Sequence, residues 1–223
     1  MHGNWRPRCK AGGERTLLGS YERERKPIAQ RNTIAARLLT QHVGNLDIPP
    51  DLERDYDERG VTARARFGGQ LEVFRGQFAS LGVQLAARYD GSEIICPDGA
   101  PPPDDPLEYR PSSVPGGRLP HLWIHLTKGK RRSVFDDLHA GFTLLRIGPV
   151  RRNVDAFRAA ARERRIPLQV LDVGEDKAFD LYQCRLLLVR PDQHIAWRGD
   201  HAPQDAGAVL DEVVGISIRE RSL

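Results

Sequence analysis

Cysteine is scarce in this chain. Only Cys9, Cys96 and Cys184 occur among 223 residues, and they form no C-x-x-C pair. An odd number of widely spaced cysteines argues against a disulfide framework and predicts a reducing, cytoplasmic setting. No apolar run approaches the roughly 20 residues that a membrane helix needs, and no short apolar stretch follows the basic start. The sequence therefore predicts neither a membrane partner nor a secretory signal.

Surplus positive charge is also scarce beyond the first residues. The formal net charge of the chain is +4. Residues 1–31 carry eight basic and three acidic side chains, so their net charge of +5 exceeds that of the whole chain. The remainder is close to neutral, so we expect no nucleic-acid partner. One later basic cluster has no interleaved aromatic residue, and we interpret it as a solvated loop. It consists of Lys128, Lys130, Arg131 and Arg132.

Three glycine-dependent motifs are missing from the sequence. It contains no G-x-G-x-x-G, no P-loop and no G-x-S-x-G string. Each of these motifs needs its glycines for a close backbone approach or a tight turn, so their absence is informative. The sequence therefore has no signature of its own for a dinucleotide, a nucleoside triphosphate or a serine hydrolase.

Helical spacing is clearest in the first third of the chain. Residues 14–43 carry an apolar stripe that Pro27 interrupts, because proline lacks an N–H and clashes with the preceding turn. We expect two helical pieces or one kinked helix there, and a further helix at Val61–Leu81. Residues 1–13 show neither a period nor a cap, and we expect them to be unstructured. The helical segment as a whole covers residues 14–81.

Residues 82–118 have a different character. Seven prolines lie between Pro97 and Pro115, counting both, and they exclude long regular structure. Proline also lowers the entropy that the chain loses on ordering, so a proline-rich strap can be well ordered where it lies on a larger body. We therefore expect a strap over residues 82–118.

Residues 119–218 alternate short apolar strands with helices. The pattern predicts an α/β fold with a mixed sheet and helices on both faces, in the order β-α-β-α-β-β-β-α. Val154, Phe157 and Ala161 form the expected buried face of one helix. The expected strands are Leu122–Leu126, Phe142–Ile147, Leu168–Val173, Leu186–Arg190 and Ile195–Arg198. The expected helices begin after a capping box at Ser133 and Asp136, at Asn153 and at Asp205.

Few side chains in this pattern suggest chemistry. His121 and His125 lie in a predicted strand, about 13 Å apart at roughly 3.3 Å per residue, so we expect no metal site. His194 and Asp192 could do acid–base work at a predicted hairpin tip, but no nucleophile is identifiable beside them. Cys184 precedes an apolar strand and is typical of a core residue. A hydrolase or thiol enzyme built around His194 or Cys184 remains a weaker alternative.

Two segments resemble a known enzyme family. Leu18–Ala29 (LGSYERERKPIA) is similar to the SYExERxPxA segment of flavin-dependent aromatic hydroxylases of the para-hydroxybenzoate hydroxylase class. Leu188–Arg198 (LVRPDQHIAWR) is similar to a late segment of phenol and polyketide hydroxylases with an extra thioredoxin-like domain. The resemblance covers about residues 14–215. Its motif residues, which have no assigned role, are Tyr21, Arg25, Pro27, Arg190, Pro191, Asp192, His194, Trp197 and Arg198.

The resemblance implies a thioredoxin-like domain at residues 119–218, without redox activity, because Gly148–Asn153 holds no cysteine where an active thioredoxin has C-x-x-C. Family members use FAD, NAD(P)H and O₂ to hydroxylate a phenolic or polyketide-like ring. Their FAD-binding motifs lie upstream of the first segment and are absent here. We therefore expect the C-terminal portion of such an enzyme, whether a remnant, a misjudged gene start or half of a split gene. Alone it should be inactive, with no catalytic residue and no metal of its own.

A second hypothesis is a free-standing, non-redox thioredoxin-like interaction module. The helices at 14–43 and 61–81 would then pair with a second copy or another chain. Under the first hypothesis the partner is a missing N-terminal FAD-binding part, and the strap and the accessory domain would shield the flavin site or mediate dimer contacts.

Overall fold

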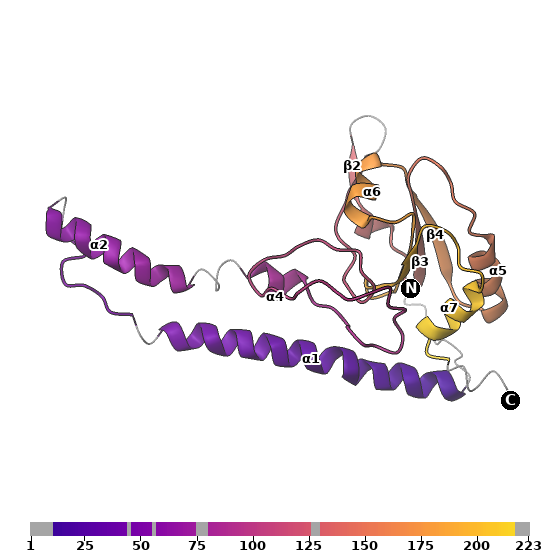
Figure 1. The fold of residues 1–223 in the computed structure, drawn as a ribbon, viewed down its shortest axis with the longest axis horizontal. Coiled ribbons are helices and arrows are strands. Elements are labelled where there is room, and N and C mark those ends of the chain that lie inside the picture. The colour runs from indigo at the N-terminus through magenta and orange to yellow at the C-terminus, as the bar shows by residue number, and fades with distance from the viewer. Residues whose placement is uncertain (1–10, 44–45, 55–56, 75–79, 126–129, 217–223) are drawn as a thin grey trace, which may run out of the picture. The chain divides into compact units, whose positions relative to one another are not determined.

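The computed structural model describes residues 11–43, 46–54, 57–74, 80–125 and 130–216 (Figure 1). The chain divides into two units. The first, which we call the sheet unit, comprises Met1–Lys26, Arg88–Pro102 and Pro111–Leu223. The second, the helical unit, comprises Pro27–Ala87 and Pro103–Arg110. Over the described ranges, no helix is both long enough and apolar enough to cross a bilayer.

A four-stranded mixed sheet forms the centre of the sheet unit. Its strand order is β4-β3-β5-β6, with β3 parallel to β4 and antiparallel to β5, and with β5 antiparallel to β6. The parallel pair is joined by a crossover helix, as parallel neighbours require, and the β5–β6 pair by a hairpin. The strands are β3 (Phe142–Ile147), β4 (Leu168–Val173), β5 (Leu186–Val189) and β6 (Ile195–Gly199).

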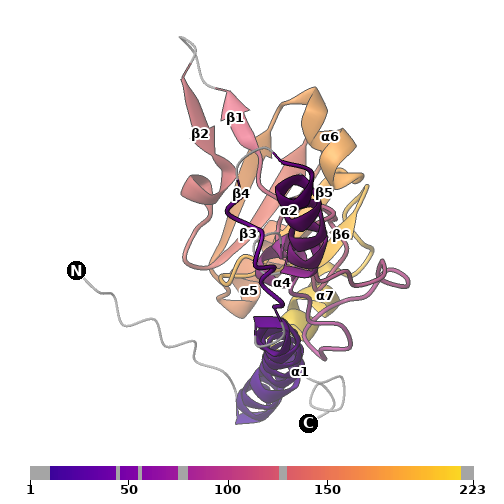
Figure 2. The same cartoon turned by 90° about the vertical axis from the view of Figure 1, so that its left-hand side faces the viewer.

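Helices cover both faces of this sheet, as predicted (Figure 2). Leu144 of β3 packs in the cluster with α5 and α7, whereas its neighbour Leu145 packs in the cluster with α6. This alternation follows from the two-residue period of a strand. The helices are α5 (Asp155–Arg164), α6 (Asp176–Tyr182) and α7 (Ala206–Val213). The order β3-α5-β4-α6-β5-β6-α7 is a thioredoxin-like fold.

The strap extends the sheet beyond β6. Gly116 donates its N–H to the carbonyl oxygen of Ile195 at 2.7 Å, and the N–H of Ile195 donates to Gly117 at 2.9 Å. Cys96 donates to the carbonyl of Ala196 at 2.8 Å. The outer edge of β6 is therefore paired rather than open, which protects it from association with other strands. These hydrogen bonds attach residues 96, 116 and 117 of the strap to β6.

The prediction for residues 119–141 is only partly right. Strand β1 (Trp123–His125) pairs with β2 (Arg131–Ser133) in a separate two-stranded ribbon and does not join the main sheet. Ser133 and Asp136 form the expected capping box, which opens the short 3₁₀ helix η3 (Val134–Asp137). Lys128 of the basic cluster lies outside the described residues. Hydrophobicity alone located the strand but not its partner.

Other boundaries differ from the expectations. Helix α6 was not predicted, although its buried residues Ala178 and Tyr182 have helical spacing. Helix α1 (Ala11–Val43) runs through Pro27 and begins within the segment expected to be unstructured, whose residues 1–10 lie outside the described residues. The second predicted helix is α2 (Glu58–Leu71), followed by the 3₁₀ helix η1 (Glu72–Phe74).

The helical unit is held by polar contacts. Arg31 of α1 donates to both carboxylate oxygens of Asp104, at 2.6 and 2.8 Å, and to the carbonyl oxygen of Gly82 at 3.0 Å. Gly82 lies in α4 (Leu81–Leu85), and a Cβ at this position would lie 1.7 Å from the carbonyl oxygen of Asp105.

Apolar burial is scarce in the helical unit. Of its described hydrophobic side chains, only Ala63 is buried. A unit without a core of its own is not expected to be stable in isolation. Its exposed large hydrophobic residues are Ile34, Leu38, Ile48, Val61, Leu71, Leu81 and Leu107.

Candidate functional site

The two motif segments meet in a buried ion pair beside the sheet. Arg190 follows β5 directly and donates from both terminal nitrogens to the carboxylate of Glu24 on α1, at 2.6 and 2.9 Å. The two side chains are only 10% and 5% exposed. This two-pronged geometry fixes orientation as well as distance, because the planar guanidinium matches the carboxylate. It joins segments that are 166 residues apart in sequence.

The strap contributes two residues to the same place. Ser92 donates its hydroxyl proton to Glu24 Oε1 at 2.6 Å. The ring of Tyr89 stacks on His194 with 4.1 Å between centroids, and the Arg190 guanidinium lies 5.4 Å from the Tyr89 centroid. We call the assembled residues the polar cluster. They are Glu24, Tyr89, Ser92, Arg190, Asp192 and His194.

His194 is held by its own hairpin. Its Nδ1 lies 3.1 Å from the carbonyl oxygen of Asp192, and because a carbonyl only accepts, Nδ1 carries the proton. Its Nε2 is buried and has no hydrogen-bond partner within the described ranges. The Asp192 carboxylate lies 3.6 Å from Nδ1. This arrangement favours a structural role for His194 over the acid–base alternative.

Neighbouring charges and hydrogen bonds keep Arg190 and Asp192 of the cluster charged. Burial by itself would lower the pKa of Arg190, but the hydrogen bonds to Glu24 and the charge of Asp192 outweigh it and raise that pKa. Burial likewise would raise the pKa of Asp192, but hydrogen bonding to His194 and the charge of Arg190 bring it down to about 2. Both groups therefore stay charged at neutral pH, as a buried ion pair requires.

Asp192 gives the first testable prediction. Its pKa in the folded protein lies below the ordinary value of 3.8. The unfolded chain therefore binds a proton that the folded protein does not, over a window from about pH 5 to pH 2, and the folded state loses on the order of 2 kcal/mol across it. In urea unfolding, the stability advantage of the wild type over Asp192→Asn should be larger at pH 6 than at pH 3. The variant Asp180→Asn, at an exposed position, is the control. An advantage that does not change with pH would contradict the prediction.

The remaining motif residues lie elsewhere. Trp197 packs on Phe157 in the core, with 5.2 Å between ring centroids. Arg198 binds the strap, through an ion pair with Asp98 and a 2.7 Å hydrogen bond to Ser113. Trp197 therefore contributes to core packing, whereas Arg198 attaches the strap to β6.

The first motif segment is mostly exposed. Tyr21 is 67% exposed, and the Arg25 guanidinium lies 5.5 Å from the centroid of Tyr89. Pro191 lies exposed in the β5–β6 hairpin, and Pro27 lies exposed within α1. Sequence reasoning thus named Arg25, Arg190, Asp192 and His194 but missed Glu24, Tyr89 and Ser92. Only contacts between distant segments identify those three.

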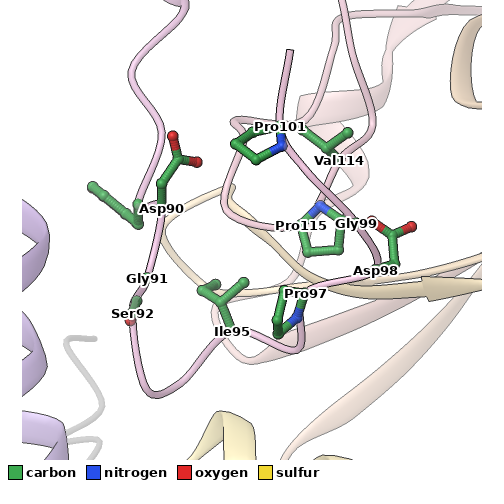
Figure 3. A pocket seen from close by; sticks show the side chains of 11 residues that line it. Asp90, Gly91, Ser92, Ile95, Pro97, Asp98, Gly99, Pro101, Val114 and Pro115 are labelled. Atoms are coloured by element: carbon green, nitrogen blue, oxygen red, sulfur yellow. The ribbon is translucent and has the colours of Figure 1, made fainter. Parts of the chain in front are cut away.

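A small pocket adjoins the polar cluster. Figure 3 shows its lining from two arms of the strap, residues 89–101 and 114–115, with Ile95, Pro97 and Pro115 supplying apolar surface. Its volume is about 100 Å³. The carboxylates at its border are engaged, since Asp90 pairs with Arg88 and Asp98 with Arg198.

This pocket does not fit FAD. Pockets for drug-sized ligands and cofactors measure roughly 300–1,000 Å³. The sequence also lacks the glycine-rich turn that would bring backbone N–H groups against a pyrophosphate. The residues of the polar cluster and its pocket therefore do not hold the flavin.

The cysteines that the structure describes are Cys96 and Cys184. Cys184 is 4% exposed, and burial raises its pKa to about 12, so it is protonated at neutral pH. Burial likewise raises the pKa of Cys96 to about 12. Within the described part of the chain, no three His, Cys, Asp or Glu side chains gather to bind a metal ion. His121 instead lies edge-on to Trp123, 4.8 Å between centroids.

Comparison with known proteins identifies the fold's relatives. Residues 112–216 match the family described as "Aromatic-ring hydroxylase, C-terminal". The chain is 32% identical to the FAD-dependent monooxygenase apdD of Emericella nidulans over 91% of its own length and 34% of the relative's. It is 28% identical to phenol 2-monooxygenase of Pseudomonas sp., over 94% of this chain and 40% of that enzyme.

Solved structures give the same result. A structure of RebC soaked with chromopyrrolic acid, with bound 7-carboxy-K252c, superposes with a TM-score of 0.79 at 33% identity, over 91% of this chain and 38% of RebC. A ternary complex of aklavinone-11 hydroxylase with FAD and aklavinone has a TM-score of 0.60 at 27% identity, over 93% of this chain and 36% of that one.

Fold and cluster together define a thioredoxin-like domain without redox cysteines, to which a strap and a helix are fastened. The chain is similar to the C-terminal region of FAD-dependent aromatic-ring monooxygenases. It spans 34% and 40% of the length of the two curated relatives cited above.

Proposed function

We propose that this chain serves as the C-terminal part of an FAD-dependent monooxygenase that uses NAD(P)H and O₂ to hydroxylate a phenolic or polyketide-like aromatic substrate. The observation that carries the proposal is the Glu24–Arg190 pair, which joins the two family-like segments in one buried contact. Similarity to monooxygenases over about nine-tenths of the chain supports it. The flavin chemistry belongs to a part of the enzyme that these residues do not form, so no reaction step is assigned to them.

The proposed division of labour follows the chain. Residues 14–81 are the helical segment that adjoins the FAD- and substrate-binding region, residues 82–118 are the strap, and residues 119–218 are the accessory domain. The exposed apolar side chains of the helical unit support a partner surface, since they lack a core to enter. The partner is the missing FAD-binding part or, for a dimer, a second copy of the chain.

Flavin retention tests this proposal. The chain is purified, mixed with excess FAD and freed of unbound flavin, and phenol 2-monooxygenase carried through the same steps is the positive control. We expect the control to keep its flavin and this chain to keep far less than one equivalent. Stoichiometric flavin on the chain alone, or hydroxylation of a phenol by it, would refute the assigned role.

A non-redox interaction module is the second candidate. It is favoured by the exposed apolar residues of α1, which include Leu18 and Tyr21, and by a thioredoxin-like fold that lacks C-x-x-C. Sedimentation and thermal melting distinguish the candidates. A stable dimer with one cooperative transition supports the module, whereas aggregation of the isolated chain supports the need for the missing part.

A further inference from the structure

The first half of α1 is attached through its polar side. Of its described side chains between residues 16 and 26, the two that are buried belong to Ser20 and Glu24. Leu18 and Tyr21 are 75% and 67% exposed. Helices normally bury an apolar stripe and expose their polar face, whereas this half-helix buries polar residues and exposes apolar ones.

Glu24 supplies the buried hydrogen bonds between this half-helix and the rest of the sheet unit. Ser20 donates its hydroxyl proton to the carbonyl oxygen of Leu17, within its own helix. Glu24 instead accepts two hydrogen bonds from Arg190 and one from Ser92. An exposed ion pair between Arg23 and Glu93 adds to it, but exposed pairs contribute little. The half-helix therefore has little apolar contact to keep it in place without the cluster.

The strap is bound to the same guanidinium. Tyr89 is 3% exposed, stacks on His194 and lies beside the guanidinium of Arg190. Ser92 is buried and has its hydrogen bond to Glu24. Arg190 also donates to Asp192 at 2.8 Å, which fixes the guanidinium from its own hairpin. One side chain on the rigid sheet thus contacts both α1 and the strap.

We propose that Arg190 is a positioning residue that couples α1 to the strap, so that residues 16–26 and 88–93 dock on the sheet edge and release from it together. The physical reason is charge burial. Without Arg190, the Glu24 carboxylate would be buried without a cation beside it. Moving the Glu24 side chain from the site into water then lowers the free energy. Its departure removes the acceptor of Ser92, and the loss of Arg190 uncovers Tyr89.

This coupling adds to the proposed function. Only its role within an enzyme rests on that proposed function. The helix is the segment that the resemblance places next to the flavin-binding region, and the strap lines the small pocket. A joint between them would transmit a displacement of one to the other. The coupling itself is a property of this chain and can be measured without flavin.

Hydrogen–deuterium exchange of the purified chain tests the joint. In Arg190→Met, amides of residues 16–26 and of 88–93 should exchange faster by a similar factor, on the order of 100-fold. Amides of β3 and β4 should keep their protection. Arg185→Met is the matched control, since Arg185 lies at the other end of β5 and covers Phe179, 3.8 Å from its ring centroid. It should leave both segments unchanged.

Two further variants keep the test decisive. Glu24→Gln retains the shape of Glu24 and removes its charge, so it should also increase exchange in both segments. If Arg190→Met also lowers the protection of β3, the exchange of the two segments in Glu24→Gln tests the coupling instead. The double variant Glu24→Gln/Arg190→Met removes both members of the Glu24–Arg190 pair, so no unpaired carboxylate remains on α1, and it should exchange more slowly than Arg190→Met. Loosening of only one segment, no change in either, or faster exchange in the double variant would overturn the coupling. None of these outcomes depends on whether the chain serves a flavoenzyme.

Discussion

Replacing Phe157 by alanine is expected to lower the free energy of unfolding by about 3–5 kcal/mol, the usual loss for a large aromatic side chain removed from a core. Phe157 is completely buried in α5 and packs against the ring of Trp197. The cavity would open between α5 and the sheet, in a cluster that also contains Leu144 and Leu210. Urea unfolding followed by far-UV circular dichroism measures the loss.

Phe179→Ala is the control for this prediction. Phe179 lies in α6 and is 36% exposed, so its truncation leaves less of a cavity. We expect a loss of less than half that of Phe157→Ala. Equal losses for the two variants would show that the α5 face of the sheet is not the principal core. The tryptophan fluorescence spectrum should change only in Phe157→Ala, because that change loosens the packing of Trp197.

The burial of Phe157 shows what hydrophobic periodicity can predict. Val154, Phe157 and Ala161 were expected on one helix face, and all three are buried. Asn153 was expected to cap this helix, but the helix has Val154 at its N-cap position, without a side-chain capping hydrogen bond. The side-chain oxygen of Asn153, one residue earlier, accepts from the N–H of Asp155 at 2.8 Å. Apolar spacing is a local property that the sequence carries fully, whereas the predicted cap is wrong by one residue.

Helix α6 shows the limit of that reasoning. It has only seven residues, and its N-cap residue Glu175 makes no capping side-chain hydrogen bond. Ala178 and Tyr182 are buried four residues apart, and Tyr182 donates its hydroxyl proton to the carbonyl oxygen of Pro120 at 2.8 Å. Two apolar positions in one short stretch do not distinguish a helix from a loop. Tertiary contacts, which the sequence does not display, stabilise it.

The polar cluster was unpredictable for a related reason. Glu24 lies between the motif residues Tyr21 and Arg25, yet it is the one of the three that is buried. A charged residue is assigned by default to the solvent face of a helix, and here the apolar residues face outward instead. Tyr89 precedes the proline-rich part of the strap, where no period marks a buried ring. The pairing of residues 24 and 190 becomes visible only after folding.

A second buried ion pair leads to the other large expected effect. Arg164 at the end of α5 donates to both carboxylate oxygens of Asp211 on α7, at 2.7 and 3.2 Å. The side chains are 23% and 9% exposed. Arg164→Met deprives the buried carboxylate of this guanidinium, and we expect a loss of about 3 kcal/mol, at the low end for buried pairs because Arg164 is partly solvated. Urea unfolding at pH 7 measures it.

Arg162→Met is the matched control, because Arg162 lies in the same last turn of α5 but is exposed. Both arginines interact favourably with the helix dipole, a contribution of roughly 0.3–1 kcal/mol, so only the excess for Arg164 reports on the pair. The double variant Arg164→Met/Asp211→Asn should recover part of the loss, since it removes the buried negative charge. Equal losses for Arg162→Met and Arg164→Met would contradict the assignment. Recovery would mean that this pair determines how α5 packs on α7 rather than adding net stability. Gly207 of α7 leaves room for the Arg164 guanidinium in that packing.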